Sequence, residues 1–390
     1  MNVDELPHDP AAALPDDGSV VTGVEVGARR VPLRRPWGPD VQDVRVLTVR
    51  ITTATGAVGE GFSWTPSIGA GAVRALLEDD VRPFLVGRPA HPRVWSRLWS
   101  HLHEAGSGGI TTMALAGVDL ALWDLVGRAR GTALADLLGR RREPQPVYGS
   151  GVNLHYSLPE LRDQVRRWVD AGYTGAKVKV GLPDLAEDLR RVAAVREVLG
   201  DGRTLMVDAN QRWDLPRALR ASRALAEFSP AWLEEPLRAD DTAGHVRLRR
   251  EGPLRVAAGE NVHTWYRFRD LLTAGALDVV QPNVIRVGGI TPFLSIAHLA
   301  RSAGAELAPH LLPELSGQLA VTFDEAVWVE DVEDAGFWES GALSRPVGGS
   351  LAGGAYRAGD RPGLGFRFHE DPPPGVPPAQ GSPAPAGVLA

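Results

Sequence analysis

Three acidic residues recur at a fixed interval in this chain, each at the end of a short apolar run. Asp208 ends LMVD, Glu234 ends AWLE and Glu260 ends RVAAGE, so successive acids are 26 positions apart (234 − 208 and 260 − 234). One strand, one helix and two loops occupy about that length, because a parallel barrel of eight such units has roughly 250 residues. The spacing therefore predicts three successive parallel strands with the three acids at the same height.

The same rhythm extends on both sides of these acids, from residue 145 to residue 345. Short apolar runs alternate with amphipathic helical segments, beginning with a strand at 147–150 and ending with one at 327–330. We count eight strands, with one helix missing or altered at the end. The predicted fold class is therefore α/β, with a TIM-type (β/α)7β-like barrel.

The segments outside the barrel predict a second domain. Residues 19–140 alternate in polarity as strands do and then take a helical period, which indicates an N-terminal α+β capping domain. The Gly-rich segment 346–370 is expected to return to this domain and complete it. Residues 1–18 and 371–390 are rich in proline, and we expect both to be disordered tails.

Composition and charge exclude several classes of function. The chain has 390 residues, a net charge of −6 and no cysteine, so disulfides, thiolate catalysis and zinc–thiolate sites are excluded. It has no basic stripe, so no nucleic-acid partner is expected. We see neither a signal peptide nor an apolar run long enough to span a bilayer, and we expect a soluble cytoplasmic protein with no membrane contact.

Polar side chains occupy nearly every predicted strand end, where such barrels carry their chemistry. They are Lys177 and Lys179, Asp208 and Asn210, Glu234 and Glu235, Glu260, Asn283, His310 and Glu330. A helix cap or a surface residue explains any one of them alone, whereas the set favours an active site. Three carboxylates without cysteine suit a hard cation, best Mg²⁺, whose open positions a substrate carboxylate could fill. The alternative is a solvated acidic rim.

Lys177 and Lys179 lie two apart on one predicted strand, so both side chains face the same side. We expect that side to be the barrel interior, because otherwise Ala176, Val178 and Val180 would fill it. A neighbouring dication predicts lowered pKa values for both lysines, and a neutral lysine can abstract the proton α to a carboxylate. A pair of surface lysines is the alternative.

Two further groups have both a functional and an ordinary interpretation. His310 follows the apolar run LAP and can face Lys179 across the barrel, or it can be a structural histidine. Loops of the capping domain could close over the barrel mouth and choose the substrate, or they could be ordinary surface; their candidate residues are Arg34, Arg35, Trp37, Trp64 and Ser67.

Together these motifs resemble the enolase superfamily, specifically the mandelate racemase-like branch of its mandelate racemase/muconate lactonizing enzyme family. The resemblance covers nearly the whole chain apart from the tails. It rests on DLALWDLVGRARG, KVK, VDAN, LEEP, AAGEN, QPN…GGIT, LAPH and WVE. It implies that Asp208, Glu234 and Glu260 bind Mg²⁺.

The resemblance also implies roles for the remaining residues at the strand ends. Lys179 would be the base on one face of the substrate, and His310 the acid or base on the opposite face. Lys177 would neutralise the substrate carboxylate, and Glu330 would bond this carboxylate or the developing enediolate. Asn210 would contact the substrate or the metal shell.

Asn283 departs from the pattern of this branch, in which an aspartate usually follows the Gln-Pro pair and forms a dyad with the histidine. An amide oxygen can still accept the Nδ1–H of His310, but it carries no charge. We therefore expect a lower pKa for His310 than a dyad histidine has. A one-base syn-dehydration or a cycloisomerisation tolerates this change better than a symmetric two-base racemase does.

The predicted function is Mg²⁺-dependent abstraction of the proton α to a carboxylate through an enediolate. Our first choice is dehydration of an acid sugar, an aldonate or an aldarate. The alternative is a racemase, epimerase or cycloisomerase of a hydroxy acid or sugar lactone, and a remote third is a catalytically silent carboxylate-binding barrel. The expected partner is a small-molecule carboxylate, and we expect a homo-oligomer.

Overall fold

The structure is a computed structural model, and it describes residues 6, 10–12, 14, 16, 18–38 and 41–369. The predicted C-terminal tail 371–390 lies outside the described residues, as does most of the predicted tail 1–18.

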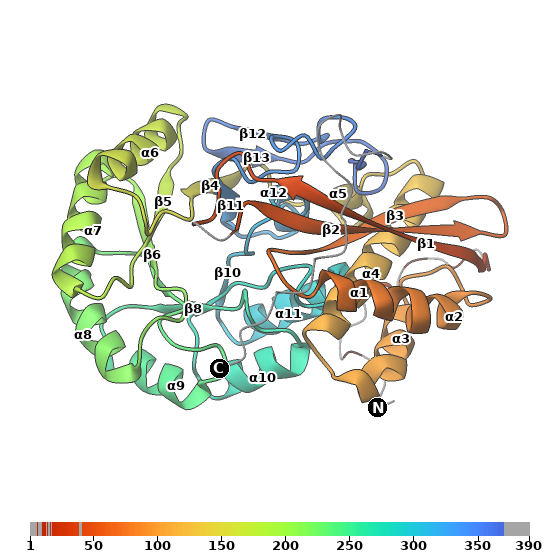
Figure 1. Ribbon diagram of the computed structural model, residues 1–390, viewed down its shortest axis with the longest axis horizontal. Coiled ribbons are helices and arrows are strands. Elements are labelled where there is room, and N and C mark those ends of the chain that lie inside the picture. Colours follow the sequence, from red (N-terminus) through yellow and green to blue (C-terminus); the bar gives the residue numbers. More distant parts are fainter. Residues whose placement is uncertain are drawn as a thin grey trace, which may run out of the picture.

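An antiparallel sheet opens the fold, with strands β1 (Val21–Pro32), β2 (Asp43–Thr53) and β3 (Val58–Thr65) in that order. One face packs against helix α4 (Ile110–Ala129). Gly59 and Gly61 permit this close approach, because an added Cβ would lie 2.0 Å from the Ala121 carbonyl oxygen and 2.2 Å from that of Gly117. Figure 1 shows the sheet and its helices as one half of the molecule.

The other helical elements of this half are short. They are α1 (Ala70–Leu76), the π-helical turn η1 (Leu77–Val81), α2 (Arg82–Leu85), α3 (Val94–Leu102), the 3-10 turn η2 (His103–Ala105) and α5 (Leu134–Leu137).

Helix α4 contradicts the expectation that the chain has no apolar run long enough to span a bilayer. It is long and apolar enough, by length and composition alone, to cross a bilayer, although we expected no such run in the chain. Within the fold, 89% of its most apolar 18-residue stretch is buried. It packs against both the sheet and helix α11 (Ile290–Ser302) of the barrel. A helix that is apolar all round and enclosed in this way is a core helix.

Eight parallel strands in the described residues build the barrel. They are β4 (Gln145–Ser150), β5 (Gly175–Lys179), β6 (Thr204–Asp208), β7 (Leu233–Glu234), β8 (Val256–Ala258), β9 (Val279–Val280), β10 (Glu306–Leu307) and β11 (Val329–Val332). Strands β4 to β10 pair in sequence order, and β11 pairs with β4.

A helix follows each of the first seven barrel strands. These are α6 (Leu158–Asp170), α7 (Leu185–Leu199), α8 (Leu215–Leu225, extended by η3 at Ala226–Phe228), α9 (Thr242–Glu251), α10 (Trp265–Thr273), α11 (Ile290–Ser302) and α12 (Pro313–Ala320). No helix follows β11 in the described residues. The predicted (β/α)7β architecture is therefore confirmed, and the helices line the outer side of the barrel in Figure 1.

The strand register confirms only part of the predicted alignment of the acids. Lys179 pairs with Asp208, and Asp208 pairs with Glu234. Glu234 pairs with Ala257, so Glu260 lies three residues beyond the level of the other two acids. The chain bends at Gly259, whose φ of 152° and contact with the Gln281 backbone exclude a side chain there. The level of Glu234 recurs after only 23 residues (257 − 234), so equal spacing of the acids in sequence hides a shorter repeat between β7 and β8.

The C-terminal segment contacts both halves of the molecule. Strands β12 (Ser350–Ala352) and β13 (Ala355–Arg357) form a hairpin, and β13 adds to the barrel sheet antiparallel to β4. Beyond this hairpin, the Leu364 backbone N–H donates to the Asp124 carboxylate on α4 at 2.9 Å. The rings of Phe366 and Phe368 then contact Phe62 of β3.

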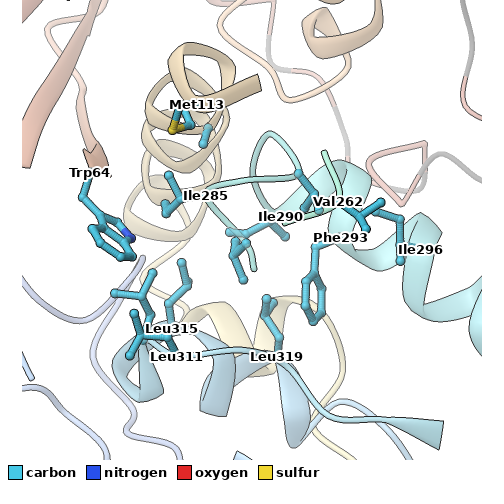
Figure 2. Packing of buried hydrophobic residues seen from close by; sticks show 14 of the residues in the cluster. Trp64, Met113, Val262, Ile285, Ile290, Phe293, Ile296, Leu311, Leu315 and Leu319 are labelled. Carbon is cyan, nitrogen blue, oxygen red and sulfur yellow. The ribbon is translucent and has the colours of Figure 1, made fainter. Parts of the chain in front are cut away.

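The two halves share one apolar core. In Figure 2, Trp64 of β3 and Met113 of α4 lie beside barrel residues that include Ile285, Ile290 and Leu315. A buried polar contact adds to it, because the Asp119 carboxylate on α4 accepts the backbone N–H and the hydroxyl of Thr291 at 2.9 and 2.6 Å. Capping helix α4 therefore holds the start of α11, which follows the loop that carries Asn283.

Candidate active site

Three carboxylates converge at the C-terminal ends of the barrel strands. Asp208, Glu234 and Glu260 each offer an oxygen atom, and these atoms lie within 4.8 Å of one another. In the described residues this is the single group of three or more such side chains that could hold a metal ion. The donor set is all oxygen and anionic, which fits a hard divalent cation such as Mg²⁺.

Both lysines point into the barrel, as predicted. The Lys177 Nζ lies 2.6 Å from Glu234 Oε1 and 2.8 Å from Glu330 Oε1, and the residue is 1% exposed. The Lys179 Nζ lies 2.5 Å from Asp208 Oδ2, and the residue is 9% exposed. Lys179 is therefore the more accessible of the two amines.

The expected lowering of the lysine pKa values assumed a bound dication, and the protein's own charged groups act in the opposite direction. Burial lowers the pKa of Lys177, but the negative charges of Glu234 and Glu330 outweigh it and hold this pKa well above its usual value. Burial also opposes the charge of Lys179, yet Asp208 raises its pKa overall. The expectation counted a neighbouring dication and left out the carboxylates with which both amines pair.

His310 lies beside Glu260, the third carboxylate of the group. Its Nε2 is 2.7 Å from Glu260 Oε2 and 3.9 Å from Glu330 Oε2. Glu330 also accepts the backbone N–H of Leu311 at 2.9 Å, which fixes its carboxylate between His310 and Lys177. Burial alone would raise the pKa of Glu330. Its interactions with Lys177 and His310 have the larger effect and lower this pKa to about 2. Glu330 is thus a permanent anion at neutral pH.

Asn283 does not accept a hydrogen bond from His310, and that expectation was wrong. Its Oδ1 is occupied by two backbone N–H groups, those of Ile285 at 3.0 Å and Arg286 at 3.1 Å. Its Nδ2 lies 3.0 Å from His310 Nδ1 and must therefore donate to it. A ring nitrogen that accepts carries no proton, so the proton of neutral His310 is on Nε2, facing Glu260.

The remaining predicted site residue, Asn210, stands at the rim. Its backbone has a φ of 42° and donates its N–H to Asp208 Oδ1 at 2.8 Å, while its side chain is exposed. The backbone of Asn210 thus orients a metal-ligand candidate, which its sequence position alone did not indicate.

Several polar contacts at the site were not predicted. The Gln281 and Trp232 side chains donate to Glu234 Oε2 at 2.6 and 3.2 Å. Asn261 donates to Glu235 and to Glu260 Oε1. Burial raises the pKa of Glu235 to about 10, so this acid is neutral and adds no charge. Gln281 could have been found, because it too is a polar residue that directly follows an apolar strand.

The capping-domain candidates differ in their surroundings. Arg35 reaches the barrel loops, where it lies 3.2 Å from both the Tyr156 hydroxyl and the Asp334 carboxylate. Trp37 packs edge-on against Trp64. Arg34 and Ser67 are exposed to solvent.

Comparisons with known proteins cover most of the chain. Residues 20–139 match the model described as mandelate racemase / muconate lactonizing enzyme, N-terminal domain, and residues 160–372 match enolase C-terminal domain-like. The chain is 38% identical over 327 residues to 3,6-anhydro-alpha-L-galactonate cycloisomerase of Streptomyces coelicolor, covering 83% of this chain and 89% of that protein. It is 34% identical over 364 residues to L-talarate/galactarate dehydratase of Salmonella typhimurium, covering 93% and 86%.

A solved structure gives the same picture in three dimensions. The L-talarate dehydratase from Polaromonas sp. JS666, complexed with Mg and L-glucarate, superposes with a TM-score of 0.80 at 36% identity. The match covers 90% of this chain and 96% of that one.

Proposed function

We propose, given that the chain belongs to the mandelate racemase/muconate lactonizing enzyme family of the enolase superfamily, that it dehydrates an acid sugar in a Mg²⁺-dependent reaction. One observation carries the proposal. The three carboxylates that can hold the cation are bounded by the Lys179 amine on one side and the His310 imidazole on the other. The relatives that act on talarate and galactarate support an acid sugar as substrate.

The metal site supplies the electrophile of this reaction. Mg²⁺ bound by Asp208, Glu234 and Glu260 would polarise the substrate carboxylate and so make the α-proton more acidic. Lys177, buried beneath the site between Glu234 and Glu330, adds a fixed positive charge near the developing enediolate.

Lys179 is the proposed base. Its neutral amine takes the α-proton, and the electrons of the C–H bond form the enediolate. The bond from the β-carbon to its oxygen then breaks, and the Lys179 ammonium returns the proton to that leaving oxygen on the same face. Water departs, and the enol tautomerises to a 2-keto-3-deoxy acid. The reaction needs one base and is a syn elimination.

His310 acts as a hydrogen-bond donor in this scheme. The Asn283 amide donates to Nδ1 and leaves the proton on Nε2, where it can stabilise negative charge on the enediolate. A base at this position would have to become imidazolium, and its Nδ1–H would then oppose the Asn283 N–H. A racemase with two equivalent bases is therefore disfavoured.

A cycloisomerase is the second candidate, because the 38% identical relative carries that name. It follows from the same enediolate when the leaving oxygen belongs to a ring, since the ring then opens and no water departs. The substrate decides between the two outcomes, and the residues of the site serve both.

The test is a screen of aldonates, aldarates and anhydro-sugar acids with added Mg²⁺. A keto-acid signal (semicarbazide absorbance) with release of water supports dehydration, and an isomeric keto acid of unchanged mass supports ring opening. Exchange of the α-proton with D₂O without a keto product supports racemisation instead. A kcat of Lys179→Ala close to that of the wild-type chain would refute the assigned base. No turnover of any acid would support a silent carboxylate-binding barrel.

The proposed setting is cytoplasmic, with a small-molecule carboxylate as the partner, no nucleic acid or membrane, and a homo-oligomeric assembly. Size-exclusion chromatography with light scattering measures the last of these directly.

A further inference from the structure

The backbone of Lys179 has an unusual hydrogen-bond partner. Strand β5 pairs with β4 only as far as Ala176 opposite Gly149, so Lys179 extends three residues beyond this pairing. Its N–H donates to Asn153 Oδ1 at 3.0 Å, within the loop that follows β4. Asn153 is completely buried. Lys179 pairs with Asp208 of β6 on one side, and on the β4 side the Asn153 side chain takes the place of a strand partner.

The orientation of Asn153 is fixed by its other contacts. Its Nδ2 donates to Gln164 Oε1 at 2.9 Å, and its carbonyl oxygen accepts Arg191 Nη2 at 2.7 Å. Gln164 lies against Gly151, where an added Cβ would be 2.5 Å from Nε2. The amide of Asn153 can therefore neither flip nor move toward the loop without losing a buried hydrogen bond.

The contacts continue from Gln164 to the capping domain. Gln164 Nε2 donates to Glu333 Oε2 at 2.9 Å, in the loop after β11. Arg35, from the loop between β1 and β2, lies 3.5 Å from the same oxygen and 3.2 Å from Asp334 Oδ2. Its guanidinium also donates to the Tyr156 hydroxyl at 3.2 Å. Arg35 thus bridges the loops after the first and last barrel strands.

The two ends of this chain of contacts differ in strength. The Arg35 side chain is 38% exposed, and such exposed ion pairs contribute on the order of 0–1 kcal/mol. The bonds from Gln164 to Lys179 are buried, and leaving a buried partner unpaired costs more. The contact of Arg35 with Glu333 is therefore weaker than the inner bonds, while Arg167 also holds Glu333 at 2.7 and 2.9 Å.

We propose that Asn153 is a positioning residue for Lys179, and that Arg35 links the capping loop at residues 33–38 to it through Glu333 and Gln164. When this loop packs on the barrel, it fixes the position of the end of β5, which carries the proposed base Lys179. A misplacement of about 1 Å at a reacting group lowers the rate by about 10²-fold. This inference rests on the proposed function, because it concerns the same base.

The test compares Asn153→Ala with Gln145→Ala. Gln145 is an equally buried amide, bonded to Val327 and Ala320 at the opposite end of β4, away from the site. We expect kcat of Asn153→Ala to fall by about 10- to 100-fold with KM little changed. The isotope effect with α-deuterated substrate should rise, because proton abstraction becomes slower. Gln145→Ala should change neither quantity.

Two further variants complete the design. Asn153→Asp keeps an acceptor for the Lys179 N–H but loses the donor to Gln164, so it should restore part of kcat. This variant also serves if Asn153→Ala does not fold. In an Arg35→Met background, Asn153→Ala should cause a smaller loss than it does alone, because the link is already broken. Equal losses in both backgrounds would refute the link, and an unchanged isotope effect in Asn153→Ala would refute the positioning role.

Hydrogen exchange separates this inference from the proposed function. Exchange at the Lys179 amide should be faster in Asn153→Ala than in the wild-type chain, whether or not a substrate is known. If no acid sugar is turned over but this exchange changes as expected, the proposed function fails and the positioning contact stands.

Discussion

Replacing Asn283 with aspartate should convert His310 from a hydrogen-bond donor into a base. Aspartate keeps one oxygen for the N–H groups of Ile285 and Arg286 and turns the other toward His310 Nδ1, 3.0 Å from the present amide nitrogen. Two acceptors cannot bond each other, so Nδ1 must gain a proton. The variant therefore favours either the other tautomer or the imidazolium.

The size of the effect follows from the kind of bond that is created. A hydrogen bond to a charged group contributes about 1.5–3 kcal/mol, and 1.36 kcal/mol corresponds to one pKa unit. The pKa of His310 should therefore rise by about 1–2 units in Asn283→Asp. Asn283 is 1% exposed, so solvent does not screen the new charge.

The measurement is the pH dependence of kcat/KM for both proteins, with Asn283→Ala as a control that removes the donor and adds no charge. In D₂O, Asn283→Asp should also gain exchange of the α-proton from the face opposite Lys179. An identical pH profile, together with exchange on one face only, would show that Asn283 does not govern the proton on His310.

Three other perturbations test separate parts of the site and fold. Lys179→Ala should lower kcat by about 10²–10⁴-fold while calorimetry still detects Mg²⁺ binding; loss of Mg²⁺ binding would contradict its role as base alone. Chelation of Mg²⁺ should abolish activity and lower Tm, because a ligand present at 100 times its Kd adds about 2.7 kcal/mol to the free energy of unfolding. Glu260→Gln should make Tm depend less on the Mg²⁺ concentration. Burial raises the pKa of Glu314 in the folded chain from its ordinary 4.5 to about 7, so stability that is present below pH 4.5 is lost as pH rises through 7. Glu314→Gln should thus raise the free energy of unfolding at pH 8 by up to about 3 kcal/mol relative to wild type, and by little at pH 4.5, in urea titrations; equal changes at both pH values would contradict this pKa.

The family and the barrel could be predicted because their signals are local and periodic. Apolar runs that alternate with amphipathic helices indicate parallel strands wherever they occur, and the family models confirm the assignment. The polar strand ends of this pattern also located Lys179, Asp208 and Glu234, which pair directly across β5, β6 and β7. Glu260 was located correctly, but its register was not, because the bend at Gly259 depends on contact with the next strand.

The features that could not be predicted are hydrogen bonds whose partners depend on the orientation of a side-chain amide. The residue type of Asn283 says that an amide is present, but two backbone N–H groups decide which end of it meets His310. The link from Asn153 to Lys179 has no periodic signature either, because Asn153 lies in a loop and acts through a single side-chain oxygen. Such contacts can be assigned only from the three-dimensional positions of the loop residues.

The charges of the site explain how Lys179 can pair with a carboxylate and still be the proposed base. Asp208, Glu234, Glu260 and Glu330 can supply four negative charges, the two lysines supply two positive ones, and His310 supplies a third only when it is protonated. A divalent cation held by Asp208, Glu234 and Glu260 would offset the excess negative charge, and it would do so beside Asp208, which raises the pKa of Lys179. Once Asp208 binds a cation, it stabilises the Lys179 ammonium less, and the pKa of that amine must fall. Lys179 can therefore be a charged partner of Asp208 without the cation and a neutral amine, the proposed base, with it. A change in Mg²⁺ concentration should accordingly shift the basic limb of the pH–rate profile.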